Sequence, residues 1–129
     1  RTEYVLAHCI SEDCRMGAGI AVAFVNRNPN MRNELLKQSP KIGEAIFYKG
    51  EQHSVFNLIT KKNYYDKPTR EDFNRAVSSL KEGMVERGLK KLALPRIGAG
   101  LDKLNWEESS RFIQEIFKDT DIQIFVVKQ

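Results

Sequence analysis

An apolar strand pattern runs into Leu94-Pro95-Arg96-Ile97-Gly98-Ala99-Gly100-Leu101-Asp102, a stretch that combines a proline, two glycines and a single acid. A strand that ends in a G-x-G loop is how α/β proteins present backbone N–H groups to a phosphate. The carboxylate of Asp102, directly behind the loop, is placed to act on whatever the phosphate anchors. Because G-x-G turns are also common as structural turns, the motif alone leaves both interpretations open.

A second glycine-rich turn lies near the start of the chain. The preceding segment, Tyr4 to Ile10, is mostly apolar without clean alternation, which is typical of a strand buried on both faces. After the polar residues Ser11 to Arg15, the small residues of Met16 to Ile20 lead into an apolar helix pattern. Strand, glycine-rich turn and helix form an anion-binding arrangement, although a tight turn that needs glycine only for packing has the same pattern.

The rest of the chain predicts helices and strands in near alternation. Residues 44–49 and 54–60 favour two strands joined by a short polar turn, which implies an antiparallel hairpin. Thr69 is placed as the N-cap of a helix with apolar residues at three- and four-residue steps, which predicts one buried stripe. Further helices are expected at 31–38 and after Trp106, and further strands at 90–95 and 122–127. This pattern predicts one α/β layered domain over residues 1–129.

Two adjacent lysines end the second strand of the expected hairpin. The period of two in a strand puts Ile59 and Lys61 on one face and Lys62 on the other. One lysine could therefore point into a site while the other meets solvent. Two solvated lysines at a strand end would give the same sequence.

Composition bounds the class of protein. The chain has 129 residues, 41% of them hydrophobic, and a net charge of +4, which suits one compact domain with a mild preference for anionic ligands. Cys9 and Cys14 lack the partners of a zinc site, so we expect free thiols and no metal. No signal peptide or long apolar span is visible, so we expect a soluble, monomeric, intracellular protein, nuclear or cytoplasmic in a eukaryote. A nucleic-acid-binding domain ranks last, because no basic stripe with interleaved aromatic residues is present.

Three blocks of sequence together resemble a known family. They are Ala7 to Ala21, Leu58 to Lys62 with Lys67-Pro68-Thr69, and Pro95 to Asp102 with Trp106-Glu107. In this order, over nearly the whole chain, they closely resemble macrodomains of the terminal ADP-ribose protein glycohydrolase type. The resemblance implies a three-layer α/β/α fold around a central mixed sheet. It also implies a first strand with a Gly-Asp-type loop that helps to hold adenine, and nothing here matches it. Either this first strand is absent from the chain or the adenine end is held differently, so the adenine pocket is unassigned.

The resemblance implies an enzyme without cofactor or metal that binds ADP-ribose and removes it from modified Glu and Asp side chains. Lys61 would be the nucleophile, forming a covalent lysine–ribose intermediate, and Asp102 the acid/base partner. Deacetylation of O-acetyl-ADP-ribose is expected at the same site. The residues implied to contact the ligand are Ser11, Met16, Gly17, Ala18, Gly19, Ile20, Thr60, Pro95, Arg96, Ile97, Gly98, Ala99, Gly100 and Leu101.

Other functions are compatible with the same fold. The domain could be a non-catalytic ADP-ribose reader, although a reader needs neither Lys61 nor Asp102. It could also be an ADP-ribose 1″-phosphate phosphatase or a hydrolase for ADP-ribosylated DNA bases, since these substrates share the distal ribose. The expected partners are ADP-ribose and mono-ADP-ribosylated proteins, with poly-ADP-ribose or ADP-ribosylated DNA as further ligands and no membrane.

Overall fold

The structure, a computed structural model, describes residues 4–15, 28–51, 53–99 and 102–127. The helix expected after Gly17 lies outside these ranges. The helices and strands within them agree with the predicted order. They are β1 (Val5–Ser11), α2 (Met31–Lys37), β2 (Ala45–Tyr48), β3 (Val55–Lys61), α3 (Arg70–Glu86), β4 (Lys91–Leu94), α4 (Trp106–Phe117) and β5 (Gln123–Val126).

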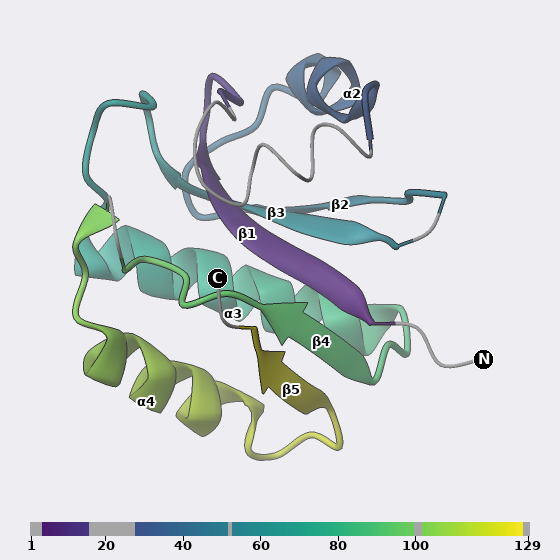
Figure 1. The fold of residues 1–129 in the computed structure, drawn as a ribbon, viewed down its shortest axis with the longest axis vertical. Helices are drawn as coiled ribbons and strands as arrows, with labels where there is room; N and C mark the ends of the chain where they lie inside the picture. Colours follow the sequence, from purple (N-terminus) through teal and green to yellow (C-terminus); the bar gives the residue numbers. More distant parts are fainter. Residues whose placement is uncertain (1–3, 16–27, 52, 100–101, 128–129) are drawn as a thin grey trace.

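The five strands form one mixed sheet in the order β2-β3-β1-β4-β5 (Figure 1). Strand β1 pairs in parallel with both β3 and β4, and β5 pairs in parallel with β4. Strand β2 is antiparallel to β3, which confirms the hairpin. The carboxyl ends of β1, β3 and β4 therefore meet at one edge of the sheet.

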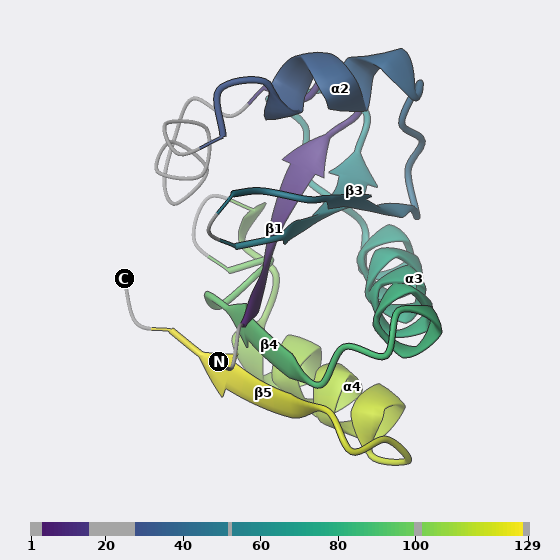
Figure 2. The same cartoon turned by 90° about the vertical axis from the view of Figure 1, so that its right-hand side faces the viewer.

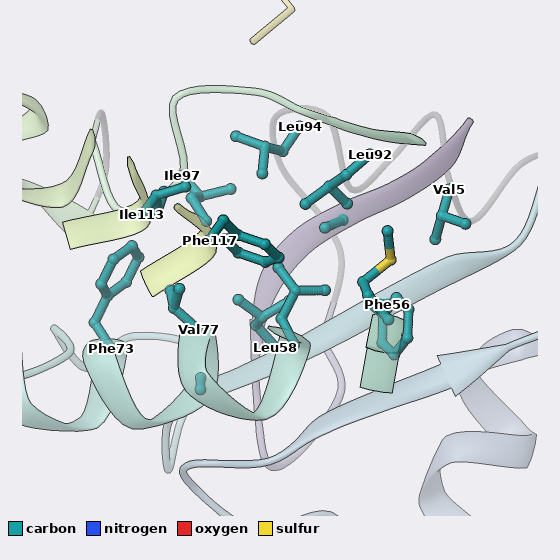
Figure 3. Close-up of a cluster of buried hydrophobic side chains, with 14 residues drawn as sticks. Val5, Phe56, Leu58, Phe73, Val77, Leu92, Leu94, Ile97, Ile113 and Phe117 are labelled. Atoms are coloured by element: carbon teal, nitrogen blue, oxygen red, sulfur yellow. The ribbon is translucent and has the colours of Figure 1, made fainter. Parts of the chain in front are cut away.

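Both faces of this sheet are covered by helices. Figure 2 shows α3 and α4 together on one side, with α2 at a distance from them. Phe56 and Leu58 of β3 belong to the apolar cluster shared with α3 and α4 (Figure 3). Their neighbours Val55 and Ile59 belong to a second cluster with Met31 and Leu35 of α2. The alternation along β3 thus separates two apolar layers, and the expected three-layer architecture with a central mixed sheet is confirmed.

Helix α3 is the main support of the larger cluster. Its N-cap is Thr69, whose hydroxyl accepts a hydrogen bond from the backbone N–H of Asp72 at 3.0 Å. The predicted apolar stripe is buried along its whole length. Trp106, at the start of α4, packs against the same cluster. The buried stripe of α3 comprises Phe73, Ala76, Val77, Leu80 and Met84.

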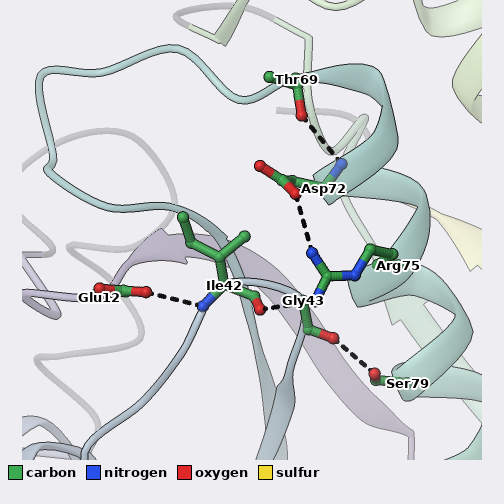
Figure 4. Close-up of polar contacts among 7 residues, drawn as sticks. All are labelled: Glu12, Ile42, Gly43, Thr69, Asp72, Arg75 and Ser79. Carbon is green, nitrogen blue, oxygen red and sulfur yellow. Dashed lines mark hydrogen bonds and ion pairs between the residues drawn. The ribbon is translucent and has the colours of Figure 1, made fainter.

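The turn before β2 connects α3 to the carboxyl end of β1 (Figure 4). The N–H of Ile42 donates to the carboxylate of Glu12 at 2.9 Å. On the other side of the turn, the hydroxyl of Ser79 donates to the Gly43 carbonyl at 2.6 Å and Arg75 donates to the Ile42 carbonyl at 3.4 Å. These hydrogen bonds fix the loop after β1 relative to α3, and the candidate site lies beside that loop.

A buried polar pair crosses from β1 to β3 inside the sheet. The imidazole Nε2 of His8 lies 2.6 Å from the side-chain oxygen of Asn57, and both residues are buried. Asn57 in turn donates to the Ile46 carbonyl at 3.2 Å. Burial lowers the pKa of His8 to about 4, although the hydrogen bond that the imidazole donates to the Asn57 side-chain oxygen opposes the shift.

This pair predicts acid-sensitive stability. The pKa of His8 is about 4 in the folded state and 6.5 in the unfolded chain, so the unfolded state binds more protons between these values. The free energy of unfolding should therefore be fully retained above pH 6.5 and fall by about 3 kcal/mol as the pH drops towards 4. Urea titrations at several pH values would measure it. His8→Gln should flatten this dependence, whereas His53→Gln, which replaces the other histidine of the chain in the turn between β2 and β3, should not. An equal loss of the pH dependence in both variants would contradict the assignment to His8.

Candidate active site

Those expected site residues that the structure describes lie where the parallel strands end. Strand β1 lies between β3 and β4, so the chain leaves β1 towards β2 and β3 on one side and later returns to β4 on the other. In open α/β sheets, the crevice at the carboxyl ends of strands around such a reversal is the usual ligand site. Ser11 ends β1, Lys61 ends β3, and Leu94 leads into the loop that reaches Asp102.

Lys61 and Asp102 form a close, half-buried pair at this edge. The ammonium group of Lys61 donates to the carboxylate of Asp102 at 2.8 Å, and each side chain keeps only 14% of its exposure. Lys62, by contrast, is exposed. The strand period thus separated the two lysines correctly. The structure brings together the two residues that the sequence resemblance implied as nucleophile and acid/base.

Strand β3 is irregular next to this pair. Its register with β1 runs from Ile10 opposite Ile59 directly to Ser11 opposite Lys61, so Thr60 has no partner position on β1. A bulge of this kind locally increases strand twist and changes the direction of the side chains around it. Thr60 itself is fully buried, and its hydroxyl has no hydrogen-bond partner among the described residues. Its predicted contact with the ligand remains a prediction.

The loop after β4 is partly buried and contains internal backbone hydrogen bonds. Pro95, Ile97 and Gly98 are buried, whereas Arg96 is exposed. The N–H of Ile97 donates to the Pro95 carbonyl at 2.7 Å, and the N–H of Ala99 donates to the Arg96 carbonyl at 3.2 Å. The loop was expected to leave its amides uncovered, but these two are used to hold the turn in shape. Gly100 and Leu101 lie outside the described residues.

Gly98 is held where a side chain does not fit. Its φ is +79°, and a Cβ there would lie 2.8 Å from Phe73 and 3.2 Å from Leu104. Gly88 has a similar φ of +65° but open space around it. Both alanine variants carry left-handed backbone strain of about 1–2 kcal/mol. Gly98→Ala should lose about 1–3 kcal/mol more in denaturant titrations, because Phe73 must move. Equal losses in the two variants would show that the packing around Gly98 is unimportant.

The loop after β1 is organised around Asp13. Ser11 is buried and its hydroxyl donates to the Asp13 carboxylate, which also accepts from the N–H groups of Arg15 and Tyr64, each at 3.2 Å. Partial burial would raise the pKa of Asp13, but these hydrogen bonds and the charge of Arg15 outweigh it and hold the pKa below its usual value. Ser11 is thus engaged within the loop, and its ligand contact remains a prediction. Met16, Gly17, Ala18, Gly19 and Ile20 lie outside the described residues.

Cys9 is a neighbour of the pair that sequence reasoning did not single out. Burial raises the pKa of its thiol strongly; the charge of Asp102 adds to this, while Lys61 and the N–H of Gly98 oppose it. The thiol therefore stays protonated, and Cys9 packs beside the Lys61–Asp102 pair rather than acting as a nucleophile. The sequence held one indication that Cys9 lies near the site: it precedes Ser11 by two residues on β1, and residues i and i+2 share a strand face.

In the described part of the chain, no group of three His, Cys, Asp or Glu side chains could hold a metal ion. Within the same ranges, none of the helices has the length and apolar character needed to cross a membrane. Cys9 and Cys14 are free thiols.

The fold and the site define a three-layer α/β/α domain with the Lys61–Asp102 pair at the carboxyl edge of its parallel strands. Comparison with known proteins identifies the family. The model of the Macro domain family matches residues 7–113. The chain is 47% identical over 121 residues to the human ADP-ribose glycohydrolase OARD1. This alignment covers 94% of this chain and 79% of that protein. The chain therefore belongs to the macro domain family.

Solved structures agree on the fold. The macrodomain of Mycobacterium tuberculosis DarG aligns with a TM-score of 0.89 at 21% identity, over 98% of this chain and 89% of that one. Thermosipho africanus DarTG in complex with ADP-ribose aligns with a TM-score of 0.84 at 17% identity, over 98% of this chain and 38% of that one.

Proposed function

We propose that this macro domain is an ADP-ribosyl hydrolase that releases ADP-ribose from modified Glu and Asp side chains through a covalent intermediate on Lys61. The observation that carries the proposal is the 2.8 Å contact between Lys61 and Asp102 at the carboxyl edge of the parallel strands. The 47% identity to a human ADP-ribose glycohydrolase supports the same activity. Pure binding of ADP-ribose requires neither an amine nor a carboxylate in contact at this position.

The first step attaches the ribose to the enzyme. Lysine has an ordinary pKa of about 10.4, so the ammonium group must lose a proton before it can attack. Asp102 is the group in direct contact that can take this proton. The amine of Lys61 then attacks C1″ of the distal ribose, the bond from C1″ to the acyl oxygen breaks, and the acceptor leaves as a carboxylate. The C1″–nitrogen adduct opens to a Schiff base as one proton moves from the nitrogen to the ring oxygen, and Asp102 releases the lysine proton to solvent, which leaves its carboxylate free to act again.

The second step releases the sugar. Water adds to C1″ of the Schiff base, with Asp102 receiving a proton from the water and returning one to the nitrogen. The C1″–nitrogen bond then breaks, which regenerates Lys61 and gives free ADP-ribose. O-acetyl-ADP-ribose carries its acyl ester on the same ribose, so deacetylation is proposed at the same pair.

The direct test is turnover of a peptide that carries ADP-ribose on a glutamate. We expect release of free ADP-ribose by the purified chain, together with thermal stabilisation by ADP-ribose that exceeds that by ADP or NAD. Stabilisation without release from the glutamate, O-acetyl or DNA-linked substrates would instead identify a reader. Release from DNA-linked substrate alone would leave the family assignment intact and replace the proposed acceptor.

A further inference from the structure

An exposed cluster of aromatic and basic side chains borders the candidate active site and has no role in the core. Tyr64 and Tyr65 keep 49% and 72% of their exposure, and their rings meet edge to face with centroids 5.4 Å apart. The guanidinium group of Arg15 lies over the Tyr64 ring, 4.4 Å from its centroid. We call Arg15, Lys62, Tyr64, Tyr65 and Lys67 the loop patch. Contiguous exposed aromatic surface beside a site is a candidate surface for interaction with a partner.

Backbone hydrogen bonds hold the loop patch in a fixed place next to the reacting pair. Tyr64 follows Lys61 by three residues, so their Cα atoms lie at most about 11 Å apart. The Asp13 carboxylate accepts from the N–H groups of both Tyr64 and Arg15, which joins the loop after β3 to the loop after β1. Both loops leave the same edge of the sheet (Figure 1). Arg15 and Tyr64 are therefore positioned by their backbone N–H groups, independently of their own side chains.

The charges of the loop patch are unbalanced. Lys62 and Lys67 are exposed, and neither has an ion-pair partner within the part of the chain that the structure describes. The nearby acids are directed into the loops, because Asp13 accepts from backbone N–H groups and Asp66 accepts from the N–H of Asn63 at 3.0 Å. The surface beside Lys61 thus presents cations and phenol rings to an incoming partner, while its acids bind backbone.

We propose that the loop patch binds the acceptor peptide and favours modified residues that are flanked by further Asp or Glu. This inference rests on the proposed function, in which the acceptor chain is joined to the C1″ that reacts at Lys61. Since an extended peptide advances about 3.3 Å per residue, two or three flanking residues span the distance from the reacting carbon to Tyr64. Carboxylates there would meet Lys62, Lys67 and Arg15, and the exposed rings would cover the apolar parts of the peptide.

The ring geometry favours a peptide over a nucleic-acid strand. Successive bases stack on open aromatic faces. Here one face of Tyr64 is covered by Arg15, and Tyr65 stands at 83° to it, so the two rings form no parallel platform. Carboxylate recognition by cations and phenols needs no such platform.

The test compares two peptides that carry ADP-ribose on the same glutamate, one flanked by Asp and Glu and one by Asn and Gln. Wild-type protein should show a kcat/KM about tenfold higher for the acidic peptide, the size expected from a few exposed ion pairs. The double variants Tyr64→Ala/Tyr65→Ala and Lys62→Gln/Lys67→Gln should lose most of this preference. Both should bind free ADP-ribose as tightly as the wild type, and Lys37→Gln, which removes an exposed lysine on α2, should keep the full preference.

Each other outcome would overturn the inference in a recognisable way. Equal rates for the two peptides in the wild type, or a preference that survives in both double variants, would exclude the loop patch as the acceptor site. If single-stranded DNA competes with peptide in the wild type and fails to bind the tyrosine variant, the patch is a nucleic-acid surface. Absence of release from both peptides, with ADP-ribose still bound, would instead remove the proposed function on which the inference rests.

Discussion

Lys61→Ala should reduce the release of ADP-ribose from a glutamate-linked peptide by at least about 10³-fold, to the level of the uncatalysed reaction. The reason is that the variant lacks the amine that the proposed mechanism bonds to C1″, whereas the loop after β4 is unchanged. Binding of free ADP-ribose, measured by calorimetry, should stay within a few-fold of the wild type. Reduction with borohydride during turnover should attach ADP-ribose to the wild-type chain and leave the variant unmodified.

Two control variants separate chemistry from charge. Lys61→Arg keeps a cation beside Asp102, but a guanidinium stays protonated and cannot form the Schiff base, so its activity should be as low as that of the alanine variant. Lys62→Ala removes the exposed neighbouring lysine and should leave the turnover of O-acetyl-ADP-ribose nearly unchanged. Substantial activity in Lys61→Arg would exclude the covalent step and favour a purely electrostatic role for residue 61.

Most of the fold could be predicted from the sequence, because the helix cap, the turn residues and the spacing of apolar residues indicate the same helices and strands. The apolar spacing in α3 and its Thr69 cap predicted a helix that the structure contains, and the short polar turn predicted the antiparallel pairing of β2 with β3. The position of Lys61 on one side of the strand followed from the period of two. Contact between Lys61 and Asp102, 41 residues apart, required the order of the parallel strands, which propensity and periodicity do not specify; the family resemblance supplied it.

The features that sequence reasoning missed depend on tertiary contacts. The register shift beside Thr60 leaves no mark in the hydrophobic pattern, since a bulge changes the pairing and not the composition. The N–H groups of Ile97 and Ala99 donate to carbonyls of their own loop because the turn closes tightly. The two glycines in the sequence had instead suggested a loop with unpaired N–H groups. Arg15 and Tyr64 lie 49 positions apart in the chain, and their contact became visible only in the structure, through the stacking of the guanidinium on the ring and the shared hydrogen bonds to Asp13.

Asp102→Asn should have the second-largest effect, a fall in turnover of about 10²–10⁴-fold. The amide oxygen can still accept a hydrogen bond from Lys61, but it cannot take the proton that the amine must lose. The negative charge of Asp102 also contributes to the stability of the fold, in contrast to the charges of exposed ion pairs, because each side chain of the Lys61–Asp102 pair is only 14% exposed. Leaving the ammonium without its counter-charge should lower the free energy of unfolding by about 1–3 kcal/mol.

The surface pair Lys90–Asp121 is a matched control for this second effect. Its nitrogen–oxygen distance is also 2.8 Å, but its side chains are 59% and 75% exposed, so Asp121→Asn should leave both turnover and unfolding nearly unchanged. ADP-ribose should still raise the melting temperature of Asp102→Asn, since the loop after β4 keeps its residues. If Asp102→Asn turned over at the wild-type rate, the proton would have to leave Lys61 by another route; if it lost activity and ADP-ribose binding together, Asp102 would be a ligand-binding residue rather than the acid/base partner.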